Sequence, residues 1–185
     1  MTSECCADVY CYEADFILHT DSDCIFTAPV TPAEYFRSGK PILLVEEYAR
    51  LGDRVPWQPV MSEVMGELCR YETMRRHPAV HYRELYGDCR NAIEKAHDCA
   101  GHFEEYILSL KPDFPQGFSE FNALGHIAMT PKWHDRYAII DLAHEARPRD
   151  LIRQYWSHGA IDQEQSTPFG ANVVPLTEIR MILNQ

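Results

Sequence analysis

The sequence predicts one α/β domain over residues 1–185, a mixed sheet flanked by helices. The hydrophobic fraction of 45% is high enough for a buried core. Short apolar runs typical of buried strands recur along the chain, and stretches with apolar residues at helical spacing lie between them. No internal repeat, low-complexity segment or linker divides the chain. These observations indicate an α/β or α+β class in a single domain.

Four apolar runs are typical of strands. They are ADFILHTD (14–21), PILLVEE (41–47), HIAMT (126–130) and YAIIDL (137–142). The first run should end near Thr20, and Pro131 predicts a turn between the last two runs.

The segment TPAEYFRSG (31–39) carries the signals of a short helix. Thr31 is a candidate N-cap, Pro32 stands at the first helical position and Glu34 completes a capping box. Gly39 is the expected end of this helix.

Five further helices are predicted. Residues 60–77 place Met61, Val64, Met65, Leu68 and Tyr71 at helical spacing until Pro78 stops the run. The other four cover 83–98, 101–110, 147–156 and 175–183, and residues 111–117 are predicted to form a loop.

The composition excludes several classes of function. Seventeen basic against 28 acidic residues give a net charge of −11, which disfavours broad nucleic-acid binding. The N-terminus lacks the features of a signal peptide, and no apolar run approaches the roughly 20 residues of a membrane span. We therefore expect a cytoplasmic protein without a membrane span.

The seven cysteines include no CxxC pair and are expected to be reduced thiols. A zinc site built on Cys5, Cys6 and Cys11 is an alternative, although the paired spacing of zinc knuckles is missing.

The first predicted strand leads into a D-x-D triplet, Asp21-Ser22-Asp23. In an extended segment the two carboxylates lie on the same side, with Ser22 opposite. Two carboxylates that close need a cation or an arginine to neutralise them, and hard oxygen donors suit Mg²⁺ or Mn²⁺. An ordinary polar turn and a phosphatase of the haloacid-dehalogenase type, with Asp21 as nucleophile and Asp23 as acid, are the alternatives.

The segment QGFSEFNALG (116–125) contains a second group of candidates. Ser119 can cap a short helix and place Glu120 in its first turn. A glutamate facing a cleft can act as a general base on an acceptor hydroxyl, and Asn122 could orient that acceptor. The alternative is a surface helix with a helpful acid in its first turn.

Two more segments carry polar candidates. In QYWSHGAID (154–162), His158 could complete a cation site, while Trp156 could stack on a base or sugar ring or pack in the core. In YETMRRHPAVHYR (71–83), the basic residues predict either an anion contact or a solvated helix end; they are Arg75, Arg76, His77, His81 and Arg83.

Taken in order, DSDCIF, YETMRRHP, FSEFNALG and WSHG resemble the metal-binding and acceptor half of GT-A type glycosyltransferases. The resemblance covers about Ala14 to Ile182. It implies a nucleoside-diphosphate sugar donor, a hydroxyl acceptor and Mn²⁺ or Mg²⁺. It further implies Asp21, Asp23 and His158 as metal ligands and Glu120 as the base if the reaction inverts. The residues implied to contact the substrates are Ser22, Arg75, Arg76, Ser119, Asn122, Trp156 and Gly159.

GT-A folds place about a hundred residues before the D-x-D, in a half that binds the nucleoside, whereas about twenty precede it in this sequence. The resemblance therefore implies an N-terminally truncated GT-A sheet with an open edge. Another chain or a second copy could cover this edge. A non-catalytic remnant or partner-binding subunit is the alternative function.

Overall fold

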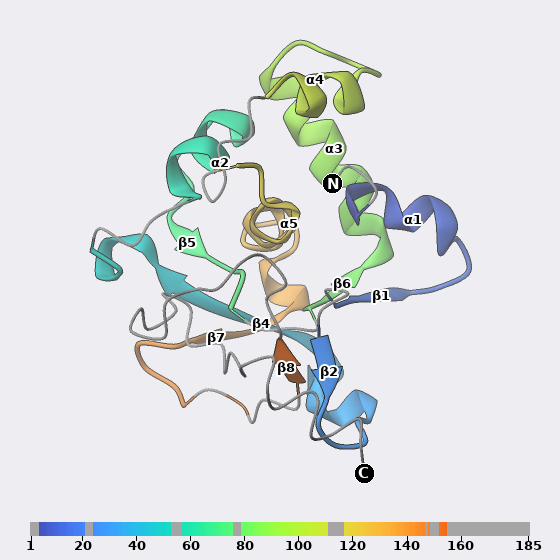
Figure 1. Cartoon of the computed structure of the whole chain (residues 1–185), viewed down its shortest axis with the longest axis vertical. Coiled ribbons are helices and arrows are strands. Elements are labelled where there is room, and N and C mark those ends of the chain that lie inside the picture. The colour runs from blue at the N-terminus through green and yellow to red at the C-terminus, as the bar shows by residue number, and fades with distance from the viewer. Residues whose placement is uncertain are drawn as a thin grey trace, which may run out of the picture.

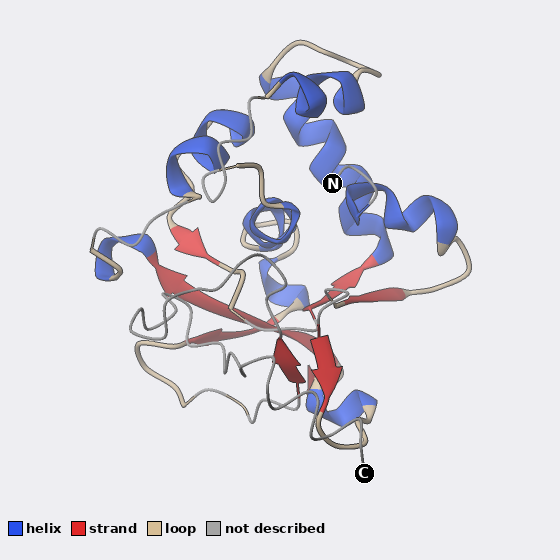
Figure 2. Ribbon diagram, viewed as in Figure 1, coloured by secondary structure: helices blue, strands red, loops and turns tan. Residues whose placement is uncertain are grey.

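The computed structural model describes residues 4–20, 24–52, 57–75, 79–110, 117–146, 148 and 152–154. The predicted mixed α/β class is confirmed. In Figures 1 and 2 the strands lie below, most of the helices lie above, and α5 (Glu120–Ala128) is seen end-on between them.

Strand β4 (Lys40–Glu47) is the centre of the largest sheet. It runs parallel to β7 (Ala138–Asp141), with Ile42 opposite Ala138. It runs antiparallel to β3 (Phe36–Arg37) and β5 (Tyr71–Glu72). Leu43, Leu44 and Val45 are all buried, as expected for a strand covered on both faces.

Two antiparallel ladders complete the strands that the structure describes. β1 (Phe16–His19) pairs with β6 (Ala79–Tyr82), and β2 (Cys24–Phe26) pairs with β8 (Ile152–Gln154). The strands predicted over 14–21, 41–47 and 137–142 are therefore confirmed as β1, β4 and β7.

Two of the other helices, α2 (Gln58–Met65) and α3 (Arg83–Ala96), pack on α5, and α1 (Ala7–Tyr10) and α4 (Phe103–Ser109) pack on α3. Short 3₁₀ turns η1, η2, η3 and η4 cover Glu4–Cys6, Pro32–Glu34, Tyr48–Arg50 and His134–Arg136. α3 and α4 confirm the helices predicted over 83–98 and 101–110. No described helix has the length and apolar character needed to cross a membrane.

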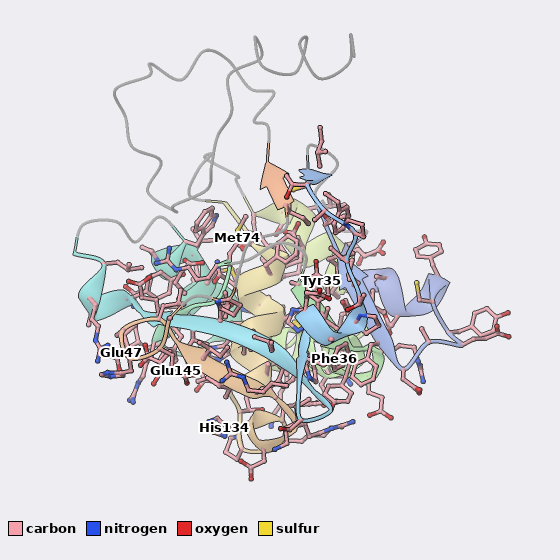
Figure 3. The ribbon with its side chains drawn as sticks, turned by 90° about the horizontal axis from the view of Figure 1, so that it is seen from below. Tyr35, Phe36, Glu47, Met74, His134 and Glu145 are labelled. Atoms are coloured by element: carbon pink, nitrogen blue, oxygen red, sulfur yellow. The ribbon has the colours of Figure 1, made fainter. Side chains whose placement is uncertain are left out.

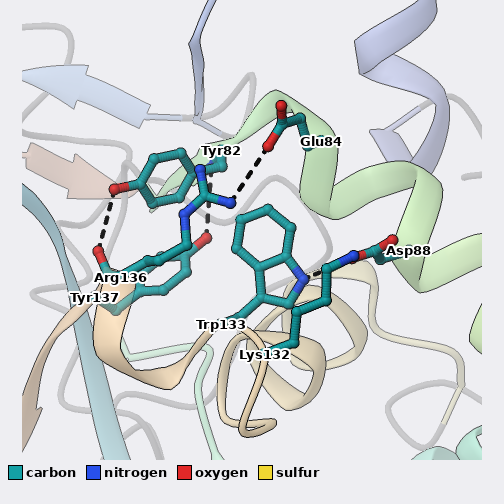
Figure 4. A network of polar contacts seen from close by, with 7 residues as sticks. All are labelled: Tyr82, Glu84, Asp88, Lys132, Trp133, Arg136 and Tyr137. Carbon is teal, nitrogen blue, oxygen red and sulfur yellow. Dashed lines mark hydrogen bonds and ion pairs between the residues drawn. The ribbon is translucent and has the colours of Figure 1, made fainter.

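A polar network fixes the chain after α5 to α3 (Figure 4). The Arg136 guanidinium lies 4.1 Å from the ring centroid of Tyr82 and 4.2 Å from that of Trp133, and it also pairs with Glu84 at 3.3 Å. The Trp133 indole N–H donates to Asp88 at 2.7 Å. These contacts set the start of β7 relative to β6 and α3.

Two predicted helices are wrong in extent. The capping box of Thr31 and Glu34 forms, but the helix ends after the 3₁₀ turn η2. Ser38 and Gly39 then have positive φ angles of 53° and 77°, and such a two-residue turn folds β3 back onto β4 as a hairpin.

The helix predicted over 60–77 ends at Met65, because Gly66 takes a left-handed C-cap with φ of 69°. β5 follows, so Tyr71 belongs to a strand, and Leu68 is 63% exposed. Met61, Val64 and Met65 are buried as predicted.

Two further predictions are wrong in type. Residues 126–128 of the predicted strand HIAMT belong to α5, a helix buried on nearly all sides whose apolar run resembles a strand. Residues 152–154, predicted as helix, form β8 because they pair with β2. The helix predicted over 175–183 and all but Gly117 of the loop predicted over 111–117 lie outside the described residues.

Candidate functional site

Four of the predicted site residues lie in the described part of the chain: Arg75, Ser119, Glu120 and Asn122. The others lie outside the described residues; they are Asp21, Ser22, Asp23, Arg76, Trp156, His158 and Gly159. The structure therefore bears on the predicted metal site through the described residues that flank this second group.

The β2–β8 ladder brings two of these flanks together. Cys24, the first residue of β2, stands opposite Gln154, the last residue of β8. Because the strands are antiparallel, the chain enters β2 and leaves β8 at the same end of the ladder. Asp23 directly precedes Cys24, and His158 is the fourth residue after Gln154.

The predicted N-cap of α5 is confirmed. The buried Ser119 Oγ accepts hydrogen bonds from Asn122 N at 3.3 Å and Asn122 Nδ2 at 3.1 Å. Glu120 therefore stands in the first helical turn, at the positive end of the helix dipole, and its side chain is half-buried.

The Glu120 carboxylate lies close enough to η1 for its negative charge to interact with the Cys5 thiol. Burial raises the pKa of Cys5, with smaller contributions from Cys89 and from the negative charge of Glu120. The Cys5 side chain is 1% exposed, so this thiol is protonated and unreactive at neutral pH.

Asn122 joins α5 to the end of β5. Its Oδ1 accepts hydrogen bonds from Thr73 N at 2.9 Å and from Thr73 Oγ1 at 3.2 Å. Asn122 is 3% exposed, and one turn later Gly125 allows the helix to touch Thr73. A Cβ at position 125 would lie 2.0 Å from Thr73 Oγ1. The helix that carries Glu120 is thus held tightly against β5.

Arg75 is not at a solvated helix end, so that interpretation is wrong for this residue. Its side chain is 4% exposed, and Nη2 lies 2.6 Å from Glu46 Oε2 near the carboxyl end of β4. Arg83, a second member of the predicted basic group, donates from Nε to the Ala14 carbonyl at 2.9 Å. Arg75 and Arg83 therefore contact different parts of the protein.

Sequence reasoning missed a buried carboxylate beside Arg75. Glu72 is 0% exposed; its Oε2 accepts from the Tyr48 hydroxyl at 2.7 Å and its Oε1 from Met74 N at 2.9 Å. Burial and the nearby Glu72 charge raise the pKa of Tyr48, which keeps the phenol protonated. No signal marked Glu72, because its segment was assigned to a helix.

The carboxyl end of β4 carries further acidic residues. Arg50 lies 3.4 Å from Glu47 and 3.9 Å from Asp141, the last residue of β7. Figure 3 shows Glu47 and Glu145 on the same side of the molecule, away from Tyr35 and Phe36. The structure describes no group of three His, Cys, Asp or Glu side chains that could hold a metal ion. Cys5, Cys6 and Cys11, all three described, do not form such a group, and none of the seven cysteines, which all lie in the described ranges, forms a disulfide.

A second polar cluster was also missed. His19 Nε2 and the Tyr86 hydroxyl share a hydrogen bond, and His81 Nδ1 lies 3.2 Å from the Tyr137 hydroxyl. Burial, with a smaller contribution from His19, lowers the pKa of His81 to about 3. His81 is therefore neutral at physiological pH.

His81 also borders a pocket between β4 and β6. Thr73 is the other polar residue of the lining, apart from the Tyr35 hydroxyl; the apolar remainder is Ile42, Leu43, Leu44, Ala79 and Val80. The pocket has no charged side chain, so it is a poor site for a diphosphate.

Comparison of the chain with protein-family models, curated proteins and solved structures finds no match. The functional argument therefore depends on the residues themselves and on their arrangement.

Proposed function

We propose that this chain is a metal-dependent glycosyltransferase of the GT-A type. It would transfer a sugar from a nucleoside-diphosphate sugar to an acceptor hydroxyl. The proposal starts from the ordered D-x-D, Ser-Glu-Phe-Asn and Trp-Ser-His-Gly motifs. The mixed α/β class is compatible with it, and cysteines that form no disulfide fit a reducing compartment such as the cytoplasm.

The observation that carries the proposal is the β2–β8 ladder. Asp23 and His158 are 135 positions apart in the sequence (158 − 23), yet each lies within four residues of the Cys24–Gln154 pair. Consecutive Cα atoms are about 3.8 Å apart. Because each residue is joined to the paired positions by so few bonds, the pairing limits how far apart Asp23 and His158 can lie.

The donor set fits a hard or borderline divalent cation, because two carboxylates and an imidazole are ligands that Mn²⁺ accepts. Held by Asp21, Asp23 and His158, such an ion would supply positive charge to the departing diphosphate. Glu120 would take the proton of the acceptor hydroxyl, and the Ser119 cap and the Thr73–Asn122 contacts would hold its helix in place. Arg75, Arg76 and Trp156 remain proposed substrate contacts, as do Ser22 and Gly159.

A calorimetric titration of Mn²⁺, with and without UDP, tests the cation site. We expect the wild-type chain to bind Mn²⁺ and the Asp21→Asn/Asp23→Asn variant to lose at least about tenfold in affinity, the usual effect of disturbing a ligand shell. His158→Ala should also weaken binding. The control is Asp135→Asn, whose carboxylate is 97% exposed and remote in sequence. Equal affinities in all four proteins would reject the cation site.

Glu120→Gln separates catalysis from binding. Loss of the base should abolish sugar transfer or donor hydrolysis while leaving nucleotide affinity unchanged, because the amide keeps the size of the carboxylate but cannot take a proton. Parallel loss of binding and activity would instead assign Glu120 a structural role.

The same assays distinguish the two alternatives. A folded chain that binds neither Mn²⁺ nor nucleotide would be the non-catalytic remnant. Release of p-nitrophenol from p-nitrophenyl phosphate with Mg²⁺, lost in Asp21→Asn, would indicate the phosphatase.

A further inference from the structure

Large apolar side chains are exposed near the N-terminus of the described chain. Val9, Tyr10 and Tyr12 are 62%, 78% and 70% exposed, and Leu18 in β1 is 46% exposed. We call these four residues the α1–β1 face. Figure 1 shows α1 and β1 on the same flank of the molecule, joined by a loop. Exposed apolar residues gathered in one short segment are typical of an interaction surface.

The segment that carries this face is firmly anchored to α3. Arg90 donates from Nη1 and Nη2 to the two carboxylate oxygens of Asp8 at 2.6 and 2.7 Å, and from Nη1 to the Cys5 carbonyl at 2.6 Å. Further along, Arg83 N and Nε donate to the carbonyls of Asp15 and Ala14 at 3.0 and 2.9 Å. The exposed tyrosines thus stand on a fixed backbone, and pre-organisation of this kind lowers the entropic cost of binding.

β1 offers a backbone edge beside these side chains. In the part of the chain that the structure describes, this strand forms a ladder with β6 alone, so its opposite edge joins no second strand. An extended peptide can add to such an edge by main-chain hydrogen bonds.

The charge of the segment selects the occupant. Residues 4–20 contain four acidic residues, Glu4, Asp8, Glu13 and Asp15, and no lysine or arginine. From α3, Arg90 pairs with Asp8 and Arg83 donates to the Ala14 carbonyl, so the carboxylates left to attract a partner are those of Glu13 and Asp15. Glu13 and Asp15 are exposed, and the whole chain carries a net charge of −11. A second copy would bring two surfaces of the same sign together, whereas a basic partner would be attracted.

We propose that the α1–β1 face binds a basic, extended polypeptide segment that adds to the edge of β1. Apolar side chains of this segment would pack on Tyr10, Tyr12 and Leu18, and its lysines or arginines would face Glu13 and Asp15. This proposal does not depend on the transferase activity.

Two synthetic peptides of about six residues, the usual length of a strand, test the proposal. One alternates lysine with valine and the other glutamate with valine. Fluorescence anisotropy should detect binding of the lysine peptide alone. Amide hydrogen exchange should slow within β1 when this peptide is bound. The Tyr10→Ser/Tyr12→Ser variant should lose about tenfold in affinity, as when an interface hot spot is truncated.

The control variant is Leu108→Ser, which removes a 74% exposed apolar side chain from α4 and should bind as the wild type does. Equal binding of the two peptides, unchanged binding by the tyrosine variant, or no binding at about millimolar peptide would each overturn the proposal. A dimer in sedimentation that the tyrosine variant abolishes would also overturn it, because the occupant would then be a second copy.

Discussion

Two buried polar regions border the pocket between β4 and β6, and they are stabilised in different ways. The β5 junction consists of Glu72, Thr73, Asn122 and Gly125, with Tyr48 on the Glu72 carboxylate. The His–Tyr cluster consists of His19, His81, Tyr86 and Tyr137, between the β1–β6 ladder, α3 and β7. The first region holds a carboxylate and two closely approaching backbones. The second holds titratable rings of which His81 is kept neutral.

The two regions therefore tolerate different changes. In the β5 junction every polar atom has a set position, so its weak point is steric: one extra carbon has no place to go. In the His–Tyr cluster the rings pack among apolar neighbours, and the weak point is charge. Burial lowers the pKa of His81, so a proton on this ring costs folding free energy.

The largest expected effect comes from Gly125→Ala. The new Cβ would lie 2.0 Å from Thr73 Oγ1 and 2.4 Å from Thr73 Cβ, so either α5 or β5 must shift. We expect a loss of about 3 kcal/mol in the free energy of unfolding, at the upper end for overpacked sites. Urea denaturation followed by circular dichroism measures this loss.

Gly87→Ala is the matched control. This glycine lies within α3, and the nearest atom to its added Cβ would be Arg90 Nη2 at 4.0 Å. Because alanine favours helix over glycine, this control should raise stability by up to about 1 kcal/mol. A Gly125→Ala variant as stable as the wild type would show that the α5–β5 contact is loose.

The two regions also differ in how far the sequence predicted them. Ser119 as a cap and Glu120 in the first turn were predicted, because capping depends on residues three positions apart. The contact of Asn122 with Thr73 spans 49 positions and could not be predicted from local pattern. The regular apolar spacing over 60–77 predicts a helix that continues through Gly66, and this prediction concealed β5.

The His–Tyr cluster was missed for a different reason. His19 stands in an apolar run, where a histidine carries no periodic signal, and the sequence groups His81 with basic residues rather than with the buried rings. Their tyrosine partners come from α3 and from the start of β7. β8 was missed because its pairing with β2 makes it a strand, and the paired residues lie 126 to 130 positions apart in the sequence. Pairing between distant segments decided both cases.

The second prediction concerns pH. The pKa of His81 is about 3 in the folded chain and 6.5 in the unfolded chain, so between these values the unfolded state binds a proton that the folded state does not. The contribution of His81 to the free energy of unfolding is therefore full above pH 6.5 and falls as the pH is lowered, by at most about 1.4 kcal/mol per pH unit. Denaturation at several pH values should show a shallower slope in His81→Asn than in the wild type.

For this measurement His134→Asn is the control, because the His134 side chain is 53% exposed and does not belong to the His–Tyr cluster. Its slope should equal that of the wild type. If His81→Asn kept the wild-type slope as well, protonation of His81 would not contribute to acid destabilisation, and the contrast with the β5 junction would be lost.

The smallest expected effect is that of Tyr137→Phe. The Tyr137 hydroxyl contacts His81 Nδ1 at 3.2 Å and accepts from Tyr82 N at 3.4 Å, and its removal leaves both atoms buried without this partner. We expect a loss of about 1 kcal/mol in the free energy of unfolding, and no change in the pH slope because burial is the main cause of the lowered His81 pKa.

Tyr106→Phe is the control: its hydroxyl contacts His97 Nε2 at 2.9 Å in a half-buried position, where water can replace it at smaller cost. Equal losses in the two variants would mean that apolar packing, rather than the hydroxyl, holds His81 in place. A changed pH slope in Tyr137→Phe alone would mean that the hydroxyl, and not burial, keeps the ring neutral.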